Sequence, residues 1–70
     1  MQPIKISKIR AYRHALGKTQ KEMSELLNIH HVVYGRKERM LVAFTDKEKV
    51  ILLNFFKGYF PNETIDSLFF

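Results

Sequence analysis

The stretch between Thr19 and Arg39 constrains the fold of this chain most strongly, because it predicts two short helices joined by a tight turn. Thr19 and Glu22 stand three residues apart, so the threonine hydroxyl can accept a bond from a backbone N–H of the first turn while the glutamate accepts one from the Thr19 amide. This capping box predicts a helix over 20–27. Its apolar stripe consists of Met23, Leu26 and Leu27. Asn28 tolerates the left-handed conformation in which helices commonly end.

A second helical pattern follows the turn and covers residues 30–39. Residues three and four apart share one face of a helix, and this pattern separates two faces. The first face, which we expect to pack inward, carries Val33, Tyr34 and Lys37. The opposite face carries His31, Val32, Gly35, Arg36 and Arg39. Two short helices in this arrangement predict a helix-turn-helix motif.

The segment before this motif predicts one further helix over 7–16. Ser7 is its candidate N-cap, and its apolar positions Ile9, Tyr12 and Leu16 recur at helical spacing. Gly17 is expected to end it, because glycine adopts the left-handed conformation without a steric penalty. Residues 1–6 are interpreted as an arm that leads into this helix.

The segment after the motif repeats the capping box with Thr45 and Glu48, which predicts a helix over 46–57. A short helical turn is expected over 64–68, within an aromatic tail that spans 59–70. The predicted fold is therefore all-α, a small four- to five-helix bundle that contains a helix-turn-helix. All 70 residues are expected to form a single domain.

Composition narrows the classes of protein further. The chain has no cysteine, so disulfides and thiol chemistry are excluded. Its longest apolar runs are far too short to cross a bilayer, and no secretory segment begins it, so we expect a cytoplasmic protein without membrane contact. The net charge of +5 is compatible with a polyanionic partner, but many small basic domains bind no nucleic acid.

Enzymatic, metal and cofactor chemistry find no support in the sequence. The serines have no histidine and acid in a triad-like order, no glycine-rich phosphate loop is present, and so small a domain offers little room for a pocket. His30 and His31 are adjacent, so on a helix their side chains diverge by about 100° and no third ligand follows at helical spacing. We expect no enzyme, no metal, no cofactor and no small-molecule ligand.

A larger set of residues resembles the Cro/repressor (XRE-type) helix-turn-helix family of phage and bacterial regulators. These residues are Ile9-Arg10, Arg13, Gly17, Thr19-Gln20, Glu22-Met23, Glu25-Leu26-Leu27, Ile29, Tyr34 and Glu38-Arg39. The resemblance covers roughly residues 7–57, and the ending over 64–70 looks like the tail of small regulators from temperate phages. It implies a switch regulator in the cytoplasm of a bacterial host cell, which could form a homodimer.

The resemblance also implies roles for individual residues. Gln20 would contact a DNA phosphate from the amino end of its helix. The base edges in the major groove would be met by His31, Val32 and Arg36. An ion pair between Arg13 and Glu38 would link the first and third helices.

Departures from the family pattern change the expected function. Base reading requires hydrogen-bonding side chains, but Val32 can touch only a thymine methyl and Gly35 has no side chain. After the third helix the family commonly has a glycine and then a cation, whereas this chain has Met40-Leu41-Val42. The glycine turn and the phosphate-binding cation are therefore expected to be lost. Lys18 stands where a buried leucine is common.

The apolar residues after the third helix allow two readings. Burial under the fourth helix would be expected first for Leu41 and Phe44. If the others are exposed beside Val32, they form an apolar patch of the kind that binds proteins.

Three hypotheses follow for the function. The first is an antirepressor that docks on the DNA-binding domain of a phage repressor and blocks operator binding. The second is a Cro-like regulator that binds operator DNA sequence-specifically, and the third is a structural or toxin–antitoxin-type binding module. The expected partner- or DNA-binding face comprises Gln20, His31, Val32, Gly35, Arg36, Arg39, Met40, Leu41 and Val42.

Overall fold

The computed structural model describes residues 7–70, which form five helices and no strand. In chain order these are α1 (Lys8–Ala15), α2 (Gln20–Leu27), α3 (His31–Glu38), α4 (Asp46–Lys57) and α5 (Ile65–Phe69). The predicted all-α class is confirmed, and every expected helix is present with ends that differ by at most one residue. The arm expected over 1–6 lies outside the described residues.

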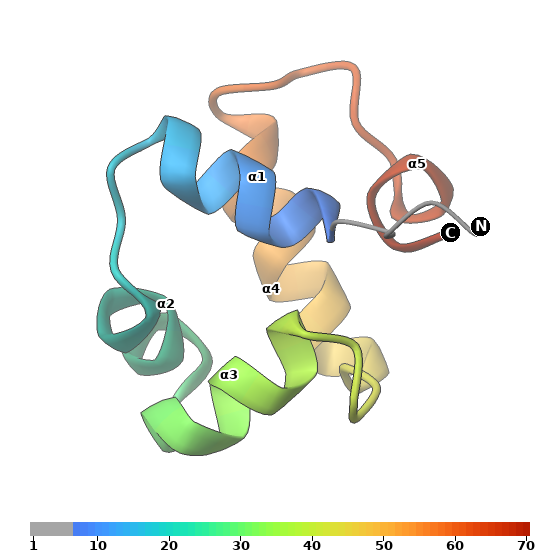
Figure 1. Ribbon diagram of the computed structural model, residues 1–70. Coiled ribbons are helices and arrows are strands. Elements are labelled where there is room, and N and C mark those ends of the chain that lie inside the picture. Colours follow the sequence, from blue (N-terminus) through green and yellow to red (C-terminus); the bar gives the residue numbers. More distant parts are fainter. Residues whose placement is uncertain (1–6) are drawn as a thin grey trace, which may run out of the picture.

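The helices are arranged around α4 (Figure 1). Helices α1, α2 and α3 surround it, and α5 packs near the amino end of α1, far from it in sequence. Every helix contributes to one core, which consists of Ile9, Met23, Leu27, Tyr34, Phe44, Leu52, Phe56 and Leu68. A single shared core explains how such short helices remain folded, because isolated helices of this length are marginal in water.

Threonine side chains fix the starts of three helices. Thr19 and Thr45 accept hydrogen bonds from the backbone N–H of Glu22 and Glu48, and both glutamates bond back to the threonine amides, which confirms both predicted capping boxes. Thr64 builds a third with a serine as its partner, and this cap was not predicted. Ser7 occupies the N-cap position of α1 but makes no capping bond with its side chain.

Three of the helices end in the same hydrogen-bonded turn. The residue in the left-handed conformation is Gly17 after α1, Asn28 after α2 and Met40 after α3, with φ of 67°, 56° and 64°. Each turn is closed by a bond across six residues: Lys18 N to Arg13 O, Ile29 N to Ser24 O, and Leu41 N to Arg36 O. The expectation that the turn after α3 is lost with its glycine is therefore wrong. The chain keeps the turn and places a methionine in it.

Candidate partner-binding face

A buried ion pair supports α3 from within. Arg13 donates from Nε to Glu38 Oε2 at 2.8 Å and from Nη2 to Glu38 Oε1 at 2.9 Å, and it also bonds the carbonyl of Lys18. Burial opposes the charged form of Glu38, but the bonds and the charge of Arg13 outweigh it and hold the pKa of this carboxyl below its ordinary value. The ion pair implied by the resemblance is present, and it joins α1 to α3.

Gln20 and Gly35 form the contact between the start of α2 and the middle of α3. A Cβ added to Gly35 would lie 3.4 Å from Gln20 Oε1, and Gln20 Nε2 donates to Glu38 Oε1 at 3.4 Å. Gly35 is buried in this contact, so its expected place on the outward face is wrong. The side chain of Gln20 covers Gly35, and a Cβ at this position would meet it in ordinary van der Waals contact.

The buried side of α3 overlaps the predicted one but does not match it completely. Tyr34, Lys37 and Glu38 are buried, whereas Val33, expected to pack inward, is 39% exposed. Lys37 reaches Glu48 at the start of α4, with 2.6 Å between Nζ and Oε1. Tyr34 and Lys37 are thus buried as predicted, and the buried side extends to Glu38 instead of Val33.

The outer side of α3 and the turn after it expose apolar side chains. The exposed fractions are 48% for Val32, 49% for Met40, 68% for Leu41 and 47% for Val42. Phe44 is buried as expected, but the expected burial of Leu41 is wrong. The chain turns back into the core only at Phe44, so the three residues before it lie on the surface.

Polar groups accompany these apolar residues, and we call the whole surface the α3 face. It comprises His31, Val32, Arg36, Arg39, Met40, Leu41 and Val42. Arg39 folds back and donates from Nε to the carbonyl of Gly35 at 3.2 Å. His31 stacks on His30, whose Nδ1 accepts from the amide of Val32 and so caps α3. Arg36, one turn after Val32, is the outward group best suited to a guanine.

The aromatic tail is fastened to α1 through Glu63. Its carboxylate accepts bonds from the hydroxyls of Tyr12 and Ser67 and pairs with Lys8 Nζ at 2.9 Å. The bonds from Ser67, Tyr12 and Lys8 lower the pKa of Glu63 to about 2. This cluster fixes α5 beside the amino end of α1, a contact that the sequence did not predict.

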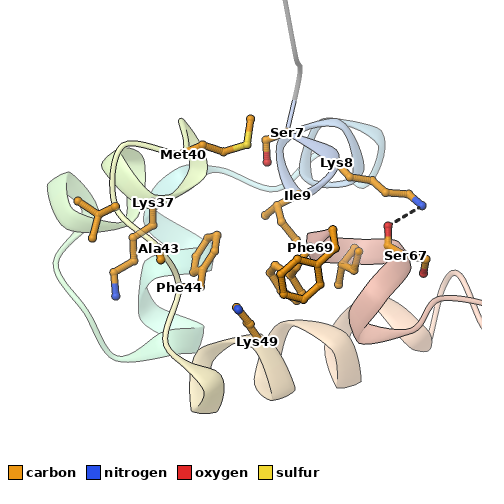
Figure 2. A pocket seen from close by; sticks show the side chains of 13 residues that line it. Ser7, Lys8, Ile9, Lys37, Met40, Ala43, Phe44, Lys49, Ser67 and Phe69 are labelled. Carbon is orange, nitrogen blue, oxygen red and sulfur yellow. Dashed lines mark hydrogen bonds between the residues drawn. The ribbon is translucent and has the colours of Figure 1, made fainter.

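A groove of about 460 Å³ lies between the start of α1, the loop after α3 and α5 (Figure 2). Its apolar lining consists of Ile9, Met40, Val42, Ala43, Phe44, Leu68, Phe69 and Phe70, and its polar lining of Ser7, Lys8, Lys37, Lys49 and Ser67. The expectation of little room for a pocket is therefore wrong. Met40 and Val42 belong both to the groove and to the α3 face.

Sequence reasoning missed this groove because its walls come from segments that are far apart in the sequence. The only local signal is the cluster of aromatic residues in the tail over 59–70. Leu68 does enter the core, but Phe69 is partly exposed and Phe70 is 80% exposed.

Comparisons of the chain with protein-family models, with curated proteins and with solved structures return no match. Within residues 7–70, no helix is long and apolar enough to cross a membrane. Over the same residues, no three histidine or acidic side chains come together as a metal site would require.

Proposed function

We propose that this protein is a phage-type transcriptional switch regulator that acts as an antirepressor. The α3 face would dock on the DNA-binding domain of a phage repressor and prevent it from binding its operator. The observation that carries this proposal is the exposure of Val32, Met40, Leu41 and Val42 where a DNA-reading helix would present hydrogen-bonding groups. Exposed apolar groups rimmed by arginine and histidine are typical of protein interfaces.

The polar groups available for base reading are few. Gly35 contributes no group because it is buried under Gln20. Gln20 directs its amide toward Glu38, so a phosphate contact would compete with that bond. Arg36 and Arg39 both lie outward, but Arg39 donates from Nε to the Gly35 carbonyl, so Arg36 is the arginine of this face better placed to read a guanine.

The energetics of the α3 face also favour a protein partner. Complete burial of a valine, leucine or methionine side chain contributes about 1.5–3 kcal/mol. Side chains that are already about half buried would each contribute roughly 1 kcal/mol, and four of them give the apolar centre that protein interfaces need. Against DNA, only a thymine methyl would reward this burial.

The alternative function is a Cro-like, sequence-specific operator-binding regulator. The net charge of +5 and the outward positions of His31, Arg36 and Arg39 favour it. In that case Arg36 would read a guanine and Val32 would touch a thymine methyl. The phosphate contacts would make the affinity fall steeply with salt.

One pair of titrations separates the two functions. The protein is titrated against labelled operator DNA at low salt and against the DNA-binding domain of the repressor from the same phage. For an antirepressor, Val32→Asp should weaken repressor binding by at least about tenfold, since it places a charge in an apolar contact. Val50→Asp is the matched control, because Val50 is 50% exposed on α4, outside the α3 face.

The outcomes are distinct. Operator binding that weakens steeply with salt, together with no repressor binding, would refute the antirepressor function. If base reading is the activity, Arg36→Ala should be the more damaging substitution.

A further inference from the structure

We propose that the groove between α1, the loop after α3 and α5 binds an acidic amphipathic peptide segment. A large apolar side chain of that segment would enter the groove, and neighbouring carboxylates would meet the lysine at its edge. This inference deepens the proposed function, since it gives the chemistry of the partner segment. It is tested with a peptide probe, so its failure is distinguishable from failure of the antirepressor function.

The walls of the groove select an apolar group. Ile9 and Phe44, which are both buried, line it together with Phe69 (Figure 2). Its volume of about 460 Å³ lies within the range of ligand pockets in proteins, which are typically about 300–1,000 Å³. A volume of this size can hold one large apolar side chain of a peptide with parts of its neighbours.

The charged residues of the groove select the sign of the partner. Among residues 7–70, the three charged residues that line the groove are all lysines and none is acidic. Two of them are already neutralised: Lys8 pairs with Glu63 at 2.9 Å and Lys37 with Glu48 at 2.6 Å. Lys49 differs, because no carboxylate of the described residues pairs with it.

Lys49 instead lies over the aromatic rings at the end of the chain. Its Nζ is 4.9 Å from the ring centre of Phe70 and 5.8 Å from that of Phe69. These cation–π contacts hold the ammonium beside the apolar walls. A carboxylate arriving there would meet a positioned cation in partly dehydrated surroundings, where attraction exceeds that in open water.

Met40 provides an independent indication that the groove is used. Its φ of 64° is one that glycine adopts freely and a methionine does not, and the corresponding turns of α1 and α2 use glycine and asparagine. The methionine side chain gains little burial in return, since it is 49% exposed. Strain of this kind is concentrated at functional positions. A flexible thioether at the rim of a groove is also a common means of adapting to a partner.

The test uses a fluorescein-labelled peptide of sequence Glu-Glu-Leu-Phe-Glu-Glu-Leu and its counterpart with lysine in place of glutamate. The full chain is titrated into the labelled peptide, and the fluorescence anisotropy of the peptide is measured. The acidic peptide should bind with a dissociation constant below about 1 mM, at least about tenfold lower than that of the basic peptide. Lys49→Glu should reverse this preference. Lys47→Glu is the matched control, because Lys47 is exposed on the same helix and does not line the groove.

A second variant tests the apolar part of the site. Met40→Gly should weaken binding of the acidic peptide several-fold, while circular dichroism shows an unchanged helix content. The proposal is overturned if neither peptide binds, if both bind equally, or if the two lysine variants behave alike. It is also overturned if laurate displaces the peptide at concentrations far below the peptide's own dissociation constant, because the groove would then be a site for a fatty acid.

Discussion

Replacing Met40 provides the sharpest test of how the turn after α3 is built. The two substitutions Met40→Gly and Met40→Ala both remove the side chain, so they lose the same partial burial. They differ in the backbone, because alanine keeps the steric conflict at φ 64° and glycine removes it. The left-handed conformation costs an L-residue about 1–2 kcal/mol, so the glycine variant should be more stable than the alanine variant by at least about 1 kcal/mol.

The stability of Met40→Gly relative to the natural chain depends on two contributions, the backbone strain that is relieved and the side-chain contact that is lost. Relief of about 1–2 kcal/mol of strain is partly offset by about 1 kcal/mol of lost contact from a half-buried methionine. Met40→Gly should therefore leave the free energy of unfolding unchanged or raise it by up to about 1 kcal/mol. Between the two variants, 1 kcal/mol corresponds to a difference in Tm of about 4–8 °C for a domain of this size.

The assay is urea and thermal unfolding followed by circular dichroism. A control of opposite sign is Ala11→Gly on the exposed side of α1, where glycine should destabilise by about 1 kcal/mol. If Met40→Gly is no more stable than Met40→Ala, the left-handed conformation does not strain the chain. Met40 would then carry no backbone strain that a role in binding has to offset.

Three further outcomes are expected. Glu38→Ala should reduce the free energy of unfolding by about 3 kcal/mol or more in denaturant titrations, because it leaves Arg13 buried and unpaired, and a loss below about 1 kcal/mol would contradict this. Tyr34→Phe should change the free energy of unfolding by no more than about 1 kcal/mol, because the Tyr34 hydroxyl is buried beside Glu38 but makes no well-formed hydrogen bond among the described residues. Glu63 should be protonated between pH 4.5 and about 2, its ordinary and folded pKa values, so its contribution is complete above that window and lost as the pH falls through it. In that pH window, NMR should show the α5 resonances shifting in the natural chain and shifting much less in Glu63→Gln.

The helices could be predicted from the sequence because their signals are local. A threonine and a glutamate three residues apart need no distant partner to cap a helix, and Thr19 and Thr45 both do so. Gly17 and Asn28 likewise end helices through their own backbone preferences. The same reasoning failed at Met40. Methionine disfavours the left-handed conformation, but the hydrogen bonds that close this turn hold Met40 in it.

The surface was harder to predict because burial depends on distant segments. Gly35 was assigned outward from its spacing, but the side chain of Gln20 covers it. Leu41 was expected to be buried because it is apolar, yet the chain returns to the core only at Phe44. The groove depends on the docking of α5, which is set by the bonds of Glu63 to two residues of α1 and one of α5.

The way α5 is attached gives the groove and the α3 face unequal local stability. A helix of five residues cannot persist alone, so α5 is held by Leu68 and by the bonds of Glu63. Such a segment can open at a free energy below that of global unfolding. Its opening would remove Phe69 and Phe70 and abolish the groove, while Arg13 and Glu38 would still hold α3 in place. Amide hydrogen exchange should therefore be fast in α5 and slow in α3.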